Sequence, residues 1–126
     1  MTPTPPIYIA VIDDDESFCR SLARLLRASH YQPVTYDSAE AFLADAKHPR
    51  FDCLLLDVAL GGISGLELGR RLAAVGSSTP IIYISAHDDE KTRADAKATG
   101  CAAFVSKVES SKVLMQVIVD TLGRKN

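Results

Sequence analysis

The chain alternates between short apolar runs and longer stretches with helical periodicity. Five apolar runs are predicted to be strands, over residues 7–12, 33–36, 53–57, 81–85 and 102–106. Their aliphatic, β-branched and aromatic side chains are typical of strands that are buried on both faces of a sheet. We therefore expect a sheet that is covered on both sides.

Each predicted strand is followed by a stretch with apolar residues at helical spacing. In the second of these stretches, Ser38 stands where a helix-capping residue is expected. The five helices are marked by these apolar positions or bounds: Phe18, Leu22, Leu25 and Leu26; Ala41, Phe42 and Ala46; Leu66–Ala74; Asp88–Thr99, ended by Gly100; and Val113, Val117, Ile118 and Leu122.

Five strand–helix units predict one α/β domain with a doubly wound, parallel five-stranded sheet. Parallel strands need helical crossovers, and these crossovers are right-handed in nearly all proteins. By analogy with flavodoxin-like folds, the expected strand order is 2-1-3-4-5. The predicted domain covers residues 7–122, between a flexible segment at 1–6 and a tail, or the start of a linker, at 123–126.

Composition supports a single domain and argues against several functional classes. With 126 residues, 47% of them hydrophobic, the chain is long enough for one sizeable core. A net charge of -2 without a basic block does not favour direct nucleic-acid binding. No apolar run approaches the roughly 18 residues of a membrane span. Cys19, Cys53 and Cys101 are odd in number and lie in apolar surroundings, so free thiols in a reducing, cytoplasmic compartment are expected.

Acidic residues stand where two of the predicted strands end. Asp13, Asp14 and Asp15 come directly after the first strand, and Asp57 ends the third. The carboxyl ends of parallel strands meet at one edge of a sheet, so Asp13, Asp14 and Asp57 are predicted to converge. Such a carboxylate cluster favours a hard divalent cation, for which Mg²⁺ is the natural candidate. Asp15 is better explained as the cap of the following helix.

Two further strands end in side chains that suit a phosphoryl group. Ser85 ends the fourth strand and Lys107 follows the fifth. A carboxylate can accept a phosphoryl group when nearby cations offset the added negative charge. Asp57 is therefore the candidate acceptor, with the Lys107 ammonium and the Ser85 hydroxyl as candidate phosphate partners.

These separated motifs together resemble the receiver domain of response regulators in two-component signalling, over about residues 7–122. The resemblance implies that Asp57 is the phosphoacceptor. It also implies that Mg²⁺ is held by Asp14, Asp13, Asp57 and the backbone carbonyl of Ala59. The phrase SAEAFL further resembles receivers that control transcription through a helix-turn-helix output domain.

The same resemblance implies a signalling role and a set of partners. Ser85 and Phe104 would move to report the phosphoryl group through the fourth helix, the fifth strand and the fifth helix. The phosphoryl group would come from a sensor histidine kinase or a phosphotransfer protein, and the response would pass to an output domain or a downstream protein. A homodimer through the same surface is a further expectation. No enzymatic activity beyond self-phosphotransfer and autodephosphorylation is expected.

Two positions depart from the usual pattern of that family. Gly61 and Val108 stand where receivers usually have proline, four residues after the acceptor and directly after the lysine. Glycine restricts the loop beside Asp57 less than proline does. Before a residue other than proline, a cis peptide bond costs roughly 3 to 4 kcal/mol, so the Lys107–Val108 bond is predicted to be trans.

The sequence leaves two other functions open. The substitutions at Gly61 and Val108 are compatible with a receiver that binds a partner without control by phosphate. A small phosphohydrolase would use Asp13 as nucleophile and Asp15 as acid. Its superfamily commonly has Thr or Val where this chain has Ser17, and 126 residues leave little room for a substrate cap.

Overall fold

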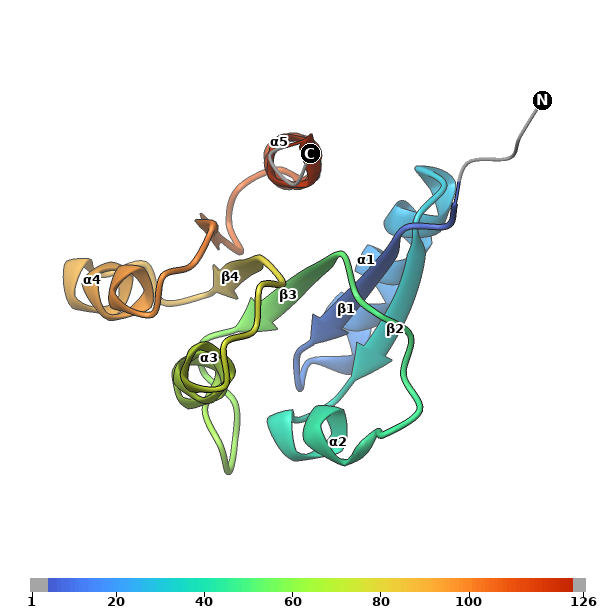
Figure 1. Cartoon of the computed structure of the whole chain (residues 1–126). Helices are drawn as coiled ribbons and strands as arrows, with labels where there is room; N and C mark the ends of the chain where they lie inside the picture. The colour runs from blue at the N-terminus through green and yellow to red at the C-terminus, as the bar shows by residue number, and fades with distance from the viewer. Residues whose placement is uncertain (1–4, 124–126) are drawn as a thin grey trace.

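The computed structural model describes residues 5–123 and contains one parallel five-stranded sheet (Figure 1). The strand order β2-β1-β3-β4-β5 confirms the predicted doubly wound α/β fold. The strands are β1 (Tyr8–Ile12), β2 (Gln32–Tyr36), β3 (Cys53–Asp57), β4 (Ile81–Ser85) and β5 (Ala103–Ser106). The helices are α1 (Glu16–Ala28), α2 (Ala39–Ala44), α3 (Gly65–Ala74), α4 (Glu90–Ala98) and α5 (Ser111–Gly123).

Helices cover both faces of the sheet (Figure 1). On one face, Leu26 of α1 and Ile118 of α5 belong to the same buried cluster as the strand side chains of that face. On the other face, a second cluster includes Phe42 of α2, Leu68 of α3 and Ala96 of α4. Every residue of β3 and β4 is buried between these layers, which explains why their sequences are almost continuously apolar.

Side-chain caps define where four of the helices begin. Asp15, Ser38, Ser64 and Asp89 each accept a hydrogen bond from a backbone N–H three residues later. A cap of this kind satisfies one of the N–H groups that a helix leaves unpaired at its start. The predicted capping roles of Asp15 and Ser38 are therefore confirmed.

The predicted apolar faces of two helices are partly wrong. α2 ends at Ala44, so Ala46 lies beyond the helix and is exposed, whereas Ala39 is buried. In α5, Val113 is 41% exposed, and the neighbouring Leu114 is buried in its place. Adjacent apolar residues fit more than one helical phase, and only packing against the sheet selects between them.

The three cysteines are free thiols, as predicted: Cys19 and Cys53 are buried and Cys101 is half-buried. Within residues 5–123, no helix has the length and apolar character needed to cross a membrane. α5 includes Gly123, one residue beyond the predicted end of the domain. The predictions for residues 1–4 and 124–126 lie outside the described part of the chain.

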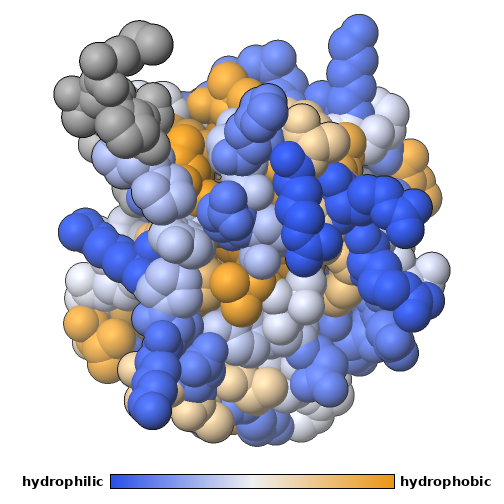
Figure 2. All heavy atoms as spheres, turned by 90° about the vertical axis from the view of Figure 1, so that its right-hand side faces the viewer, coloured by the Kyte–Doolittle hydropathy of each residue, from blue (hydrophilic) through white to orange (hydrophobic). Residues whose placement is uncertain are grey.

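β2 forms one edge of the sheet, and the surface on that side is mainly hydrophilic. Figure 2, seen from this side of the molecule, shows apolar residues as small separate patches among polar ones. Pro33 within β2 has no backbone N–H to donate to a further strand. Both features disfavour pairing of this edge with another chain.

Gly69 of α3 lies directly against the hydroxyl group of Tyr83 in β4. A Cβ atom at position 69 would come within 1.9 Å of the Tyr83 oxygen, and the Tyr83 side chain is fully buried. The hydroxyl is also hydrogen-bonded to Thr99 Oγ1, at the end of α4, across 2.9 Å. The missing side chain at position 69 therefore sets how closely α3 approaches the sheet.

Gly69→Ala is expected to lower the free energy of unfolding by about 1 to 3 kcal/mol, because overpacking a tight core site costs about that much. Tyr83→Phe removes the colliding oxygen. The double variant should therefore be more stable than the sum of the two single effects allows. Urea unfolding of the four proteins measures this coupling, and strictly additive effects would contradict the proposed contact.

Candidate metal and phosphate site

The predicted site residues lie at the carboxyl ends of four strands, at one edge of the sheet. β1 pairs with β3, β3 with β4 and β4 with β5, all in parallel register. This arrangement brings together residues from distant parts of the chain: Asp13 and Asp14 after β1, Asp57 at the end of β3, Ser85 at the end of β4 and Lys107 after β5.

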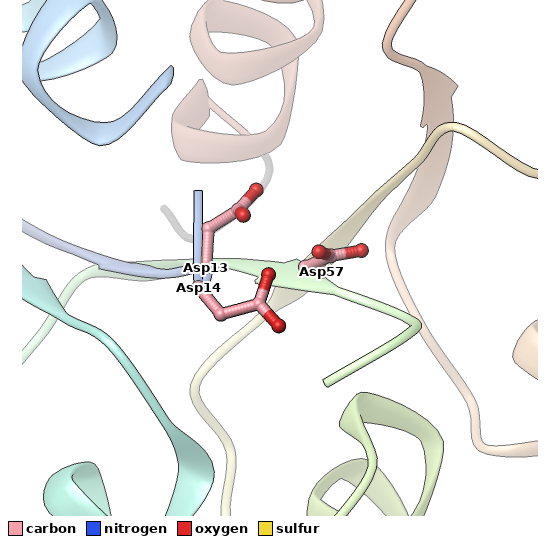
Figure 3. A group of neighbouring side chains, drawn as sticks. All are labelled: Asp13, Asp14 and Asp57. Atoms are coloured by element: carbon pink, nitrogen blue, oxygen red, sulfur yellow. The ribbon is translucent and has the colours of Figure 1, made fainter. Parts of the chain in front are cut away.

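Three carboxylates meet at this edge. Figure 3 shows Asp13 and Asp14 beside Asp57, and one oxygen of each lies within 4.8 Å of the others. Asp13 and Asp57 are buried, whereas Asp14 is exposed. Asp13 Oδ2 is a buried oxygen that accepts no hydrogen bond of regular geometry. An oxygen-only donor set with an exposed side fits Mg²⁺, which combines a few carboxylate ligands with water.

Lys107 supplies the positive charge that faces the buried carboxylates. Its Nζ lies 2.7 Å from Asp13 Oδ2 and 3.5 Å from Asp57 Oδ2. The shorter contact is an ion pair whose angles fall outside hydrogen-bond geometry. Burial lowers the pKa of Lys107, but the two acidic partners outweigh burial and the pKa is raised overall. Lys107 therefore stays protonated and balances one of two buried negative charges.

Asp57 carries a perturbed carboxyl group. Burial raises the pKa of Asp57 to about 6, and the nearby charge of Asp13 acts in the same direction. The Ala59 N–H, which donates to Asp57 Oδ1 across 3.2 Å, and the Lys107 ammonium act against this shift. Asp57 is thus mainly ionised at neutral pH, at a cost in free energy that a bound cation would reduce.

The free energy of unfolding of the cation-free protein is expected to fall by about 1 kcal/mol between pH 5 and pH 7 through Asp57 alone. The pKa of Asp57 is about 6 in the folded protein, against an ordinary value of 3.8. In the window between these values the folded state binds more protons than the unfolded state. Stability therefore decreases as the pH rises, and the decrease levels off above the folded pKa.

Urea unfolding in EDTA, for the wild type and Asp57→Asn, measures this effect as the difference between the two pH profiles. Titrating groups remote from Asp57 contribute equally to both proteins. Parallel profiles would contradict the raised pKa of Asp57. Adding Mg²⁺ should flatten the wild-type profile, because a cation favours the ionised carboxylate.

Backbone N–H groups orient the two buried acids. The Asp15 N–H donates to Asp13 Oδ1 across 2.9 Å, as the Ala59 N–H does to Asp57 Oδ1. In each case the donor lies two residues after the acid, so the loop that follows the strand holds the carboxylate. The other carboxylate oxygen of each acid, Oδ2, faces the ammonium of Lys107.

Ser85 and Phe104 lie on the neighbouring strands. Ser85 is fully buried, and its Oγ accepts a hydrogen bond from the His87 N–H across 2.9 Å. Phe104 is half-buried against the core cluster that includes Ala96 of α4, and the Arg93 guanidinium lies 4.7 Å from its ring centre. Ser85 thus lies at the edge of the carboxylate site, and Phe104 lies one strand farther away.

The two unusual loop positions are open to their surroundings. The Lys107–Val108 bond is trans, as predicted, and residues 5–123 contain no cis peptide bond. Val108 is 87% exposed. At Gly61, no atom beyond the glycine and its two chain neighbours lies within 4 Å of the place that a Cβ would take. Neither position is therefore restricted by packing, and neither has the fixed φ of a proline.

Two contacts at this edge of the sheet were not predicted from the sequence. Glu40 of α2 accepts a hydrogen bond from the Ile63 N–H across 3.1 Å and lies against Gly62, whose φ is +70. Glu40 thereby ties α2 to the loop after β3. The predicted apolar face of α1 includes Phe18, but the ring of Phe18 also lies 4.6 Å from Lys107 Nζ. No local spacing pattern links residues so far apart in the chain.

Comparison with known families gives a consistent result. The response regulator receiver domain model matches residues 9–119. The response regulator protein TmoT of Ectopseudomonas mendocina is 36% identical over 99 residues, covering 79% of this chain and 45% of that protein. The transcriptional regulatory protein FixJ of Azorhizobium caulinodans is 34% identical over 116 residues, covering 92% of this chain and 55% of that protein. The chain therefore spans about half the length of these relatives.

Solved structures share the same fold. The crystal structure of FixJ-N superposes with a TM-score of 0.85 at 29% identity and covers 95% of this chain and 96% of that one. A CheY-like receiver domain protein from Methanospirillum hungatei gives a TM-score of 0.88 with the same coverage of 95% and 96%. Its identity is 20%, so this second likeness concerns the fold alone.

Proposed function

The chain belongs to the response regulator receiver domain family, and from this premise we propose that it is a phosphorylation-dependent signalling switch with Asp57 as the phosphoryl acceptor. Receivers are signalling domains rather than ordinary enzymes. The proposal is supported above all by the convergence of Asp57 with Asp13, Asp14 and Lys107 at one edge of the sheet.

The proposed step moves a phosphoryl group from a phosphohistidine nitrogen to a carboxylate oxygen of Asp57. The new O–P bond forms as the N–P bond breaks, and the departing imidazole takes up a proton. A pKa of about 6 leaves the Asp57 carboxylate mainly ionised at neutral pH, so its oxygen is available as a nucleophile. Asp57 is largely buried, with 6% of the residue exposed.

The transferred group would add negative charge to a pocket that already contains three carboxylates. Mg²⁺ held by Asp13, Asp14, Asp57 and the Ala59 carbonyl would offset part of that charge. Lys107 now faces Asp13 and Asp57, and its flexible side chain can place the ammonium against a phosphoryl oxygen instead.

Ser85 can provide a neutral donor in the same step. Its Oγ accepts the hydrogen bond from the His87 N–H, and the O–H remains able to donate to a phosphoryl oxygen. We propose that this new hydrogen bond, together with movement of Phe104, reports phosphorylation through α4, β5 and α5. Such a switch requires two states whose relative free energies the phosphoryl group changes.

The proposed partners follow from the family. A sensor histidine kinase or a phosphotransfer protein in the cytoplasm would donate the phosphoryl group, and an output domain or a downstream protein would receive the signal. FixJ is named as a transcriptional regulatory protein, which supports a response at the level of transcription. A homodimer through α4, β5 and α5 is one way in which the signal could be transmitted.

Incubation of the wild type with acetyl phosphate, followed by intact-mass measurement, tests the proposal. One phosphoryl group per chain is expected with Mg²⁺ and none with EDTA. A folded protein that stays unmodified with Mg²⁺ would contradict the switch. It would favour instead a receiver that binds its partner without phosphate, an alternative that the open positions Gly61 and Val108 support.

A further inference from the structure

We propose that Phe18 is a positioning residue for Lys107, and that its aromatic face keeps the ammonium at the phosphoryl site. This inference rests on the proposed function and identifies a further residue that serves it. The centre of the Phe18 ring lies 4.6 Å from Lys107 Nζ. An ammonium at that distance is attracted by the negative face of an aromatic ring.

The main chain alone does not determine where the Lys107 ammonium points. The Lys107 N–H donates to the Ser85 carbonyl across 2.8 Å, and the Val108 N–H donates to Ser106 Oγ across 3.3 Å. These bonds place the Cα atom of Lys107, but four flexible carbons separate it from the charge. Val108 is 87% exposed and supplies no wall for the side chain.

Side-chain contacts must therefore orient the ammonium, and in the described chain these contacts involve Asp13, Asp57 and Phe18. Both acids belong to the carboxylate cluster. A cation in that cluster, or a phosphoryl group on Asp57, changes the charge that the acids present to Lys107. The ring carries no net charge and binds neither group, so its attraction for the ammonium does not depend on the charge of these acids.

A pocket next to this contact leaves space for other orientations of the Lys107 ammonium. Phe18 and Lys107 line a cavity of about 360 Å³ between α1 and α5, together with apolar residues that include Leu22 and Leu114. This space is open to solvent on one side, and without the aromatic ring it would widen around the ammonium. Lys107 would then sample more orientations, and fewer of them would face the reacting group.

The variant Phe18→Leu distinguishes the effect of the aromatic ring from the effect of an apolar side chain at this position, because leucine is apolar but has no ring. With acetyl phosphate and Mg²⁺, its rate of phosphorylation is expected to fall about 3- to 30-fold, the range that corresponds to a cation–π contact in a partly buried site. Phe18→Tyr keeps the ring and should stay within about twofold of the wild type. Phe42→Leu is the matched control, because Phe42 belongs to the core cluster on the opposite face of the sheet.

Two further measurements distinguish loss of the ring contact from a loss of stability caused by the substitution. Trifluorinated phenylalanine at position 18 keeps the shape of the ring but weakens its negative face, so phosphorylation should slow without loss of stability. Nuclear magnetic resonance of the unmodified protein in EDTA reports the contact directly. The ε-methylene protons of Lys107 should be shifted upfield by the ring in the wild type and Phe18→Tyr, and this shift should disappear in Phe18→Leu.

The possible outcomes separate this inference from the proposed function. If the wild type is phosphorylated, and Phe18→Leu and the fluorinated protein are phosphorylated at the same rate as the wild type, the proposed role of Phe18 is wrong. A Phe18→Tyr variant as slow as Phe18→Leu would also overturn that role. A wild type that accepts no phosphoryl group would refute the proposed function, and the inference would fall with it. Faster phosphorylation of the wild type and Phe18→Tyr than of Phe18→Leu and the fluorinated protein, together with the upfield shift, supports both the proposed function and the role of Phe18.

Discussion

Asp57→Asn is expected to abolish phosphorylation by acetyl phosphate, whereas Asp13→Asn should only slow it. Asparagine cannot form the acyl phosphate, so removal of the nucleophile leaves no covalent product. In the proposed site Asp13 would contribute charge and a ligand oxygen near the acceptor, so its loss should reduce the rate about tenfold or more without changing the modified residue. Intact-mass measurement, with release of the label by hydroxylamine, distinguishes an acyl phosphate from other adducts.

The same pair of variants separates the switch from a phosphohydrolase. If Asp13 were the nucleophile, Asp13→Asn would abolish the adduct and Asp57→Asn would retain it. Asp15 accepts the capping hydrogen bond of the Phe18 N–H, which accounts for its position without a catalytic role. Asp120→Asn, on the exposed surface of α5, controls for the change of charge. Asp57→Asn should also remain folded, because it removes a buried negative charge.

Lys107→Met is expected to lower the free energy of unfolding by about 2 to 4 kcal/mol at neutral pH in EDTA, because breaking a buried ion pair leaves an uncompensated charge. Two buried carboxylates, Asp13 and Asp57, lose their shared cation in this variant. Uptake of a proton by Asp57 limits the loss. The Lys107 side chain is 17% exposed, which also keeps the effect below that of a fully buried pair.

Mg²⁺ should stabilise Lys107→Met more than the wild type, since the metal would replace the missing positive charge beside the same carboxylates. Urea unfolding with and without Mg²⁺ measures both effects. Lys112→Met is the matched control, because Lys112 is exposed on α5 and forms no ion pair among residues 5–123. Equal stability losses in the two lysine variants would contradict the charge balance inferred for the site.

Hydrophobic periodicity predicted the fold well where burial is continuous. The bounds of β3 and β4 match their predicted ranges, since both strands are buried on both faces and are apolar up to their last residues, Asp57 and Ser85. Prediction was less accurate for α2 and α5. Ala46 and Val113 are apolar but exposed. An apolar residue near a helix end need not be buried, and helical periodicity alone does not show which of two adjacent apolar residues faces the sheet.

Strand-end positions also predicted which acids would meet. Asp13, Asp14 and Asp57 converge because parallel strands direct their carboxyl ends to the same edge of the sheet. The ring contact between Phe18 and Lys107 could not be predicted in this way. It depends on how the start of α1 is placed relative to the segment that follows β5, and that placement results from packing across the whole face of the sheet.

The amino-acid sequence was sufficient to predict the succession of strands and helices and the edge of the sheet that carries the acids, and it supplied the candidate residues of the proposed phosphoryl site. These features follow from local periodicity and from the geometry of parallel strands. The folded structure was needed to find that Lys107 faces both Asp13 and Asp57, that the pKa of Asp57 rises to about 6, and that Phe18 faces the ammonium. Electrostatic energies depend on separation and burial, and these emerge only when distant segments pack together.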